Sequence, residues 1–299
     1  MPWPPILVRY GEIGIKSRTV RSQFEKRLVE RIEEQLVRRG AESEVLREEG
    51  RIVVRAAEQE KALDALKHTF GIVSASPARQ CASDIDVIAD EVAMVARELV
   101  PKGASFALKV KRVGEHKFTS LDVAKRAAGR VFDALPDHAL TVNLNEPDVA
   151  LHVEVRDNES FVFTRTIRGP GGLPLGSQGR VGVWVDGPRA AHAAWLIGKR
   201  GASLYFFAPD IAKAEAWLAP LAPWIPQFRV RQSPSVKDAS GLLDMLRCQA
   251  LIRADGLEAQ WESRDADADA GVPVFRPLTG YPGARFRELA RLAELPEEV

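Results

Sequence analysis

The pattern of apolar and polar residues over positions 1–78 predicts a small domain in which helices pack on one face of a sheet. Apolar residues recur every four positions from Phe24 to Leu36, with charged residues between them, as expected for an amphipathic helix. Short apolar runs between polar turns predict the strands. The expected elements are a strand at 6–10, a helix at 24–36, strands at 44–46 and 52–55, a helix at 63–70 and a further strand. This is the ferredoxin-like order.

A second α/β domain is expected over residues 79–167. Its most regular strand alternates apolar Phe106, Leu108 and Val110 with Lys109 and Lys111, so one face packs and the other is charged. Helical spacing of apolar residues precedes and follows this strand. The expected elements are a helix at 84–100, a strand at 106–112, a helix at 121–135 and strands at 140–144, 149–155 and 161–167.

Residues 168–180 are rich in glycine and proline, with little that packs, and are expected to form a linker or an exposed loop. Over residues 181–299, strands and helices alternate, which is typical of a doubly wound parallel sheet. The expected elements are strands at 181–185, 203–208, 228–230 and 272–275, helices from 189, at 210–221, at 239–254 and around 286–292, and a polar loop at 265–270. The sequence thus predicts an α/β protein with three domains.

Composition adds little to this picture. The 299 residues carry a formal net charge of +1, so only local clustering of cations can make a nucleic-acid site. No apolar run approaches the roughly 20 residues of a membrane span, and the N-terminus lacks a signal pattern, so we expect a cytoplasmic protein. Cys81 and Cys248 have no metal-binding or disulfide spacing, and no metal site is expected.

One cluster of cations lies on the lysine-bearing strand and the loop after it. Such a cluster can contact phosphates, and His116 or Phe118 can stack on an unpaired base. A solvated strand face explains the same pattern, and spacing alone favours that interpretation. Lys16 and Arg21, beside the first long helix, have the same ambiguity. The residues of the cluster are Lys109, Lys111, Arg112, His116 and Lys117.

Residues 181–201 have the layout of a nucleotide site, with an apolar strand, a tight turn and an amphipathic helix. The turn, however, contains one glycine and one proline, where a phosphate loop needs several glycines and hydroxyls. Cys248 is expected in an amphipathic helix, where a buried thiol is the default.

Five segments occur in the order and at about the spacing seen in the ThiI family, the tRNA 4-thiouridine sulfurtransferases. The resemblance covers essentially the whole chain, and the first 180 residues carry its more specific matches. The segments are RYGEIGIKSRTVRSQFEKRL, FALKVKRVGEHKFTSLDVA, NEPDVALHVEV, GGLPLGSQG and FRPLTGY.

The resemblance implies a ferredoxin-like α+β domain at 1–78, a tRNA-binding THUMP α/β domain at 79–167, a linker at 168–180 and a doubly wound PP-loop-like (adenine nucleotide alpha hydrolase-like) domain at 181–299. It also implies that tRNA is the partner, held by its acceptor end, and that ATP and magnesium are the family's cofactors. By the same resemblance, the candidate tRNA contacts are Lys16, Arg21, Lys109, Lys111, Arg112, His116 and Lys117.

The third domain departs from the family's SGGxDS loop, of which Gly187 alone remains. Val185 and Ala190 offer no hydroxyl, Pro188 offers no N–H, and Arg189 reverses the charge of the family's aspartate. The TGExLGQxxSQT segment has no counterpart, and RPLxxxDK retains only its first part, with Pro282 and Gly283 replacing its acid and lysine. The aligned loop consists of Val185, Asp186, Gly187, Pro188, Arg189 and Ala190.

These departures lead to a first hypothesis: a tRNA-binding protein that no longer adenylates uridine, binds no cofactor productively, and presents tRNA to a separate modifying enzyme or an active paralogue, alone or as a homodimer. The alternative is an active tRNA uridine sulfurtransferase, or another tRNA-modifying enzyme, in which Arg189 grips a phosphate and Cys248 carries sulfur. A role in thiazole synthesis rests on the family's association alone.

Overall fold

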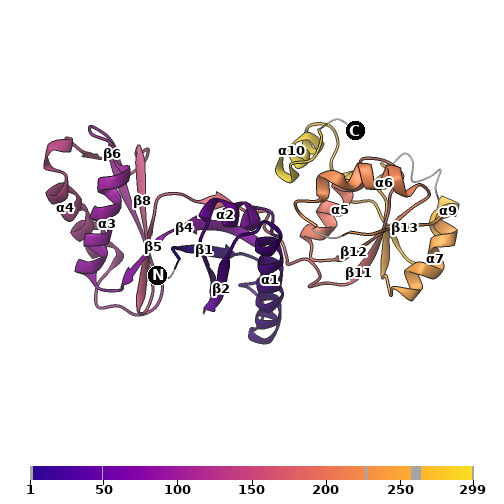
Figure 1. Ribbon diagram of the computed structural model, residues 1–299, viewed down its shortest axis with the longest axis horizontal. Helices are drawn as coiled ribbons and strands as arrows, with labels where there is room; N and C mark the ends of the chain where they lie inside the picture. Colours follow the sequence, from indigo (N-terminus) through magenta and orange to yellow (C-terminus); the bar gives the residue numbers. More distant parts are fainter. Residues whose placement is uncertain (1–2, 49, 226–227, 257–263, 298–299) are drawn as a thin grey trace.

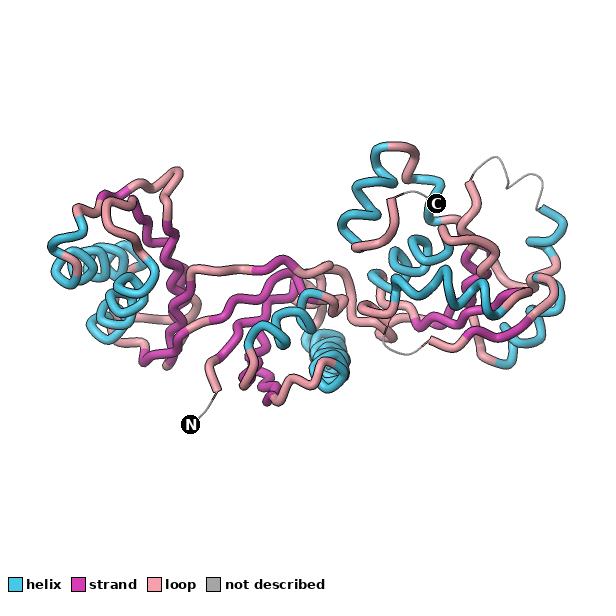
Figure 2. The backbone as a smooth tube through the Cα atoms, turned by 45° about the horizontal axis from the view of Figure 1, so that its top comes forward, coloured by secondary structure: helices cyan, strands magenta, loops and turns pink. Residues whose placement is uncertain are grey.

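The computed structural model describes residues 3–48, 50–225, 228–256 and 264–297, arranged in three domains with one five-stranded sheet each. Figures 1 and 2 show the first domain lying between the other two. Within the described ranges, no helix is long and apolar enough to cross a membrane.

The first domain has an antiparallel sheet with two helices on one face. β1 pairs with both β3 and β4, so its strands lie in the order β4-β1-β3-β2, the predicted ferredoxin-like arrangement. Leu28 and Ile32 of the first helix are fully buried against Ile6 and Val8 of the first strand. The elements are β1 (Pro5–Tyr10), α1 (Arg18–Arg38), β2 (Ser43–Glu48), β3 (Arg51–Ala56), α2 (Gln59–Lys67) and β4 (Ile72–Pro77).

The second domain has two helices on one face of its sheet, and its opposite face packs on the first domain. Phe161 and Phe163 form one buried cluster with Leu7 and Val53 of the first domain. The strand order is β5-β9-β8-β6-β7. The elements are β5 (Arg79–Ala82), α3 (Ile85–Leu99), β6 (Ser105–Arg112), α4 (Ser120–Ala134), η1 (Pro136–His138), β7 (Thr141–Val142), β8 (Val149–Val155) and β9 (Glu159–Phe163).

The chain then returns to the first domain before it enters the third. Strand β10 (Ile167–Arg168) pairs with β4, so the single strand predicted at 161–167 is in fact two strands in different sheets. Leu173 is buried in the core of the first domain, and its N–H donates to Lys199 O at 2.9 Å. The prediction that residues 168–180 hold little that packs is therefore wrong for this part of the segment.

The third domain is a parallel sheet with helices on both faces, as predicted. Its strand order is β13-β12-β11-β14-β15, and every pairing is parallel. Helices α5, α6 and α10 cover one face and α7 the other. The elements are β11 (Arg180–Trp184), α5 (Ala190–Lys199), β12 (Ser203–Ala208), α6 (Ile211–Leu218), η2 (Ala219–Leu221), β13 (Val230–Gln232), α7 (Val236–Met245), β14 (Ala250–Ile252), α9 (Arg264–Ala268), β15 (Val274–Phe275), η3 (Pro277–Gly280) and α10 (Ala284–Ala293).

Two local predictions in the third domain are wrong. The helix expected at 239–254 ends at Met245, because Arg247 takes a left-handed conformation (φ 55°) and Cys248 N–H donates back to Leu243 O at 2.8 Å. The apolar residues after this turn form β14 between β11 and β15. The polar stretch expected as a loop at 265–270 begins instead in the short helix α9.

The first and third domains meet through α1, the segment after α2 and the turn after α6. Gln35 Nε2 donates to Pro223 O at 3.1 Å, and the ring of Phe70 stacks on Trp224 with centroids 5.4 Å apart. His68 Nε2 lies 3.2 Å from Glu294 Oε2. Aromatic packing and polar contacts thus join the two domains.

Candidate functional site

The strand order of the third sheet reverses between β11 and β14. Strands β11 and β14 are neighbours, and the chain continues from β11 toward β12 but from β14 toward β15. In open parallel sheets, ligands bind at the carboxyl ends of such a strand pair. Asp186 follows β11 and Arg253 follows β14, so both residues lie at the carboxyl ends of this strand pair.

The loop between β11 and α5 uses the helix-start N–H groups within its own turn. The N–H groups of Ala190, Ala191 and His192 donate to the carbonyls of Gly187, Pro188 and Arg189 at 3.1 to 3.2 Å. The N–H of Val185 donates to Phe207 O at 2.8 Å, and Pro188 has none. A phosphate loop needs such groups free to point at its ligand, so this conformation does not present them.

An acid–arginine cluster, made of Asp186, Arg253, Asp255, Asp267 and Arg276, lies at the same strand ends. Arg253 is within 3.5 Å of all three carboxylates. Arg276 pairs with Asp255 at 3.0 Å and with Asp267 at 2.7 Å, and its side chain is 6% exposed. The carboxylates outnumber the guanidinium groups, which disfavours an anionic ligand at this place.

Within the acid–arginine cluster, the Asp186 carboxyl has a raised pKa. Partial desolvation raises the pKa of the Asp186 carboxyl, Arg253 opposes this shift, and Asp255 adds to it. Sequence reasoning identified Asp186 only through the loop and Arg276 only as the start of the retained RPL motif, and it did not connect them with Arg253, Asp255 or Asp267. The available signal was the charged residues that directly follow an apolar strand, since those positions lie at its carboxyl end.

Arg189, a catalytic candidate, packs on α10. Its guanidinium carbon lies 4.9 Å from the ring centroid of Phe286, a cation–π geometry. Gly283, where the family motif has its lysine, adopts φ +50° immediately before α10. Part of the region compared with TGExLGQxxSQT, residues 257–263, lies outside the described residues.

Cys248, the second catalytic candidate, lies between α7 and β14 in a buried apolar cluster. Burial raises the pKa of its thiol, although Arg180 and Arg231 oppose this shift. Because the thiolate is the reactive form, this surrounding favours an inert thiol. Across the described ranges, no group of three or more His, Cys, Asp or Glu residues is arranged to hold a metal ion.

The second domain exposes the predicted lysines of β6. Leu108 and Val110 pack against the core under the helices, so the alternating Lys109 and Lys111 lie on the opposite face, where both are exposed. Because β6 pairs in parallel with β8, Lys109 is level with His152. Lys109 and Lys111 therefore lie on the face of the sheet that the helices do not cover.

The other predicted contacts of the second domain lie at the end of β6 and in the loop after it. Arg112 and His116 are partly buried, and Lys117 is exposed. The ring of His116 stacks on Phe118 with centroids 5.4 Å apart, and Phe118 packs against the domain core. The loop is thus anchored from beneath by an aromatic side chain.

Lys16 and Arg21 lie in a different place, beside the third domain. Arg21 Nη2 donates to Gly14 O at 2.6 Å and to Lys16 O at 3.3 Å, so it holds the loop before α1. Glu12, in the same loop, pairs with Arg200, the residue directly after α5, at 3.1 Å. The predicted contacts are therefore divided between two regions of the protein.

Comparisons with known proteins agree with this architecture. Residues 5–76 match the ThiI ferredoxin-like domain and residues 82–165 the THUMP domain. A probable tRNA sulfurtransferase of Halobacterium salinarum is 40% identical over 252 residues, which are 81% of this chain and 64% of the relative. The chain thus spans less than two thirds of that relative's length. A probable tRNA sulfurtransferase of Methanosarcina acetivorans is 33% identical over 330 aligned positions, covering 96% of this chain and 80% of the relative.

Two solved structures share the fold over nearly the whole chain. A crystal structure of a Pyrococcus horikoshii Ot3 protein has a TM-score of 0.85 at 25% identity, covering 98% of this chain and 100% of the other. A 4-thiouridine synthetase, crystallised with RNA and bound ATP, has a TM-score of 0.77 at 22% identity, covering 97% and 85%. From the matched domains and the Methanosarcina relative, the chain belongs to the ThiI family of tRNA sulfurtransferases.

Proposed function

We propose that this protein binds tRNA through its first two domains, in the service of 4-thiouridine-type modification, and that its third domain does not adenylate uridine. The observation that carries the proposal is a contrast: β6 exposes lysines, whereas the loop at 185–190 uses its helix-start N–H groups internally. The protein would present tRNA to a separate modifying enzyme, an active paralogue or a second copy of itself.

The ion pairs of the second domain support the RNA-binding part. On α4, Arg126 pairs with Asp86, and Arg130 pairs with Asp90 at 2.7 Å. Among the described residues, Lys109, Lys111 and Lys117 form no ion pair. Cations without internal partners are those that can release counterions from a phosphate backbone, so β6 and its loop are the favoured RNA surface.

Filter binding of unmodified tRNA tests this surface. Replacing both Lys111 and Arg112 with Ala should weaken binding about tenfold and reduce the salt slope by about 2, because two phosphate contacts are lost. Lys102→Ala is the matched control, since Lys102 is exposed in the same domain but precedes β6. If the unaltered protein fails to bind tRNA at low salt, the proposal is wrong.

An adenylation assay tests the third domain. With ATP, magnesium, a persulfide donor and tRNA, we expect no release of AMP or pyrophosphate, because the acid–arginine cluster and the internally bonded loop do not fit a triphosphate. Restoring the family pattern at Val185, Asp186, Pro188, Arg189 and Ala190 should return ATP binding only in part. Pro282 and Gly283 would still lack their acid and lysine.

The second candidate function is tRNA sulfurtransferase activity through non-standard residues. The comparisons support it more directly than they support a loss of adenylation, because the relatives are named probable tRNA sulfurtransferases and one similar structure holds RNA and ATP. Against it stand the packing of Arg189 on Phe286 and the burial of Cys248. Release of AMP by the unaltered protein in the assay above would decide in its favour.

A further inference from the structure

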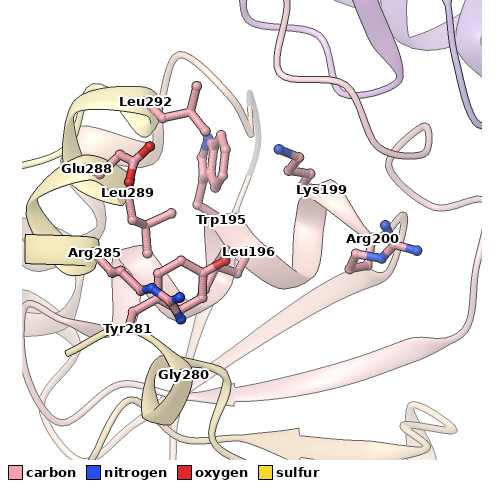
Figure 3. A pocket seen from close by; sticks show the side chains of 10 residues that line it. All are labelled: Trp195, Leu196, Lys199, Arg200, Gly280, Tyr281, Arg285, Glu288, Leu289 and Leu292. Carbon is pink, nitrogen blue, oxygen red and sulfur yellow. The ribbon is translucent and has the colours of Figure 1, made fainter.

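A cavity of about 560 Å³ lies in the third domain between α5 and the segment that runs from η3 into α10. Figure 3 shows side chains from the two helices facing each other across it. Its volume falls within the roughly 300 to 1,000 Å³ of small-molecule sites. The lining residues that matter below are Trp195, Lys199, Tyr281, Arg285, Glu288 and Leu292.

This cavity is separate from the loop at 185–190. Helix α5 starts at Ala190, whereas the cavity is lined by its second half, up to Lys199, and by Arg200 directly after it. At a rise of about 1.5 Å per residue, Lys199 lies roughly 13 Å along the helix axis from Ala190. A ligand here would approach the junction with the first domain, where Arg200 pairs with Glu12.

The apolar part of the wall suits a flat ring. Tyr281 and Leu196 line the cavity and are partly buried, and Leu292 of α10 is 52% exposed at its mouth. Trp195 is fully buried, and its indole N–H has no hydrogen-bond partner among the described residues. Because this N–H is itself buried, it lies behind the cavity wall and is not available to a ligand.

The polar part of the wall is cationic. Lys199, Arg200 and Arg285 line the cavity with a single carboxylate, Glu288. Arg200 is paired with Glu12, but within the described ranges Lys199 and Arg285 form no ion pair. Lys199 Nζ lies 5.2 Å from the ring centroid of Trp195, and Figure 3 shows its amine turned toward that ring.

The environment of Lys199 favours an anion beside it. Burial lowers the pKa of Lys199, Glu12 partly opposes the shift, and Arg200 adds to it. A negative group bound next to the amine would offset both the burial of its charge and the repulsion from Arg200. A phosphate is an anion that a lysine ammonium binds well.

We propose that this cavity binds a nucleotide, with its phosphate on Lys199 and its base beside Leu196 and Tyr281, where Arg285 also lies (Figure 3). Glu288 would accept a hydrogen bond from a base amino group. The nucleotide comes either free or as an unpaired residue of bound RNA; the second source rests on the proposed function.

Equilibrium dialysis with labelled AMP and CMP, and with a short single-stranded RNA, tests the proposal. Lys199→Ala removes a phosphate partner, Arg285→Gln changes an exposed residue with little risk to folding, and Leu292→Trp fills the mouth of the cavity. Each should weaken binding about tenfold, the loss expected for a charge-assisted hydrogen bond or for steric exclusion. Lys237→Ala is the control, because this exposed lysine lies on α7 and does not line the cavity.

The outcomes separate the two sources. Weaker mononucleotide binding in all three variants, with inorganic phosphate unable to compete, identifies a free nucleotide as the ligand. Weaker binding of the RNA alone identifies an unpaired RNA residue. Affinities for both probes that are unchanged in the three variants, or undetectable in the unaltered protein, overturn the proposal. Mononucleotide binding in a protein that fails to bind tRNA would reject only the proposed function.

Discussion

Glu154 forms ion pairs across the boundary between the first and second domains. Its carboxylate accepts from Arg9 Nη2 at 3.1 Å and from Arg156 Nη2 at 2.9 Å, with Arg51 Nη1 at 3.7 Å. Arg9 and Arg51 belong to the first domain, and Glu154 to β8 of the second. One buried acid therefore neutralises cations from both sides of the domain boundary.

The lowered pKa of Glu154 makes the stability of the folded protein depend on pH. Burial alone would raise the pKa of Glu154, but Arg9 and Arg156 outweigh it and hold the pKa below its ordinary value. The ion pairs therefore stabilise the folded protein above the ordinary glutamate pKa of about 4.3, and this stability is lost as pH falls through the lower folded pKa.

Replacing Glu154 with Gln should lower the free energy of unfolding by about 3 kcal/mol at neutral pH, since it removes the carboxylate that the partly buried Arg9 guanidinium contacts across the domain boundary. Urea unfolding at neutral and acidic pH would measure this effect. The difference between variant and unaltered protein should shrink as the pH falls. An equal difference at both pH values would contradict the role assigned to the ionised carboxylate.

At the scale of elements, the segment between β10 and β11 holds the first and third domains together. Gly171 N–H donates to Ile72 O at 2.7 Å, and Gly71 N–H donates to Gly171 O at 2.8 Å. Gly172 adopts φ +76°, and an added Cβ would lie 2.1 Å from Lys199 O of α5. Only glycine therefore fits where this segment crosses the third domain.

A pair of alanine substitutions isolates this close approach. Gly171→Ala should cost about 1 kcal/mol of stability, because φ +68° is strained but the space around the new Cβ is open. Gly172→Ala adds the collision with α5 and should cost on the order of 3 kcal/mol. Thermal unfolding measures both, and limited proteolysis of residues 173–180 should be faster only for Gly172→Ala. Equal effects would show that contact with α5 is unimportant.

The sequence predicted the features that depend on neighbouring residues and missed those that depend on residues far apart in the chain. Helices such as α1 and strands such as β6 were predictable because their apolar spacing is local. The packing of Leu173 was not, since glycine and proline carry no periodicity. The acid–arginine cluster was missed because it joins Asp186 to Arg253 through the adjacency of β11 and β14, which local spacing does not encode. Family motifs located the loop but not its bonding.

At the scale of the whole molecule, the first domain is the connection between the other two. It packs on the second domain through its sheet, at Leu7 and Val53, and on the third through α1, at Gln35. Figure 2 shows the same order, with the first domain between its neighbours. An RNA held on β6 and a nucleotide held beside Lys199 would therefore lie on opposite sides of a shared central domain.

Because the chain returns to the first domain at β10, the first sheet is completed with a delay during protein synthesis. Until β10 pairs with it, β4 is the edge of the first sheet, and about 90 residues separate β4 from β10. At roughly 5 to 20 residues per second, a translating ribosome takes several seconds to make them. The second domain is completed during this delay, so the first domain acquires its last strand only after the second domain has emerged.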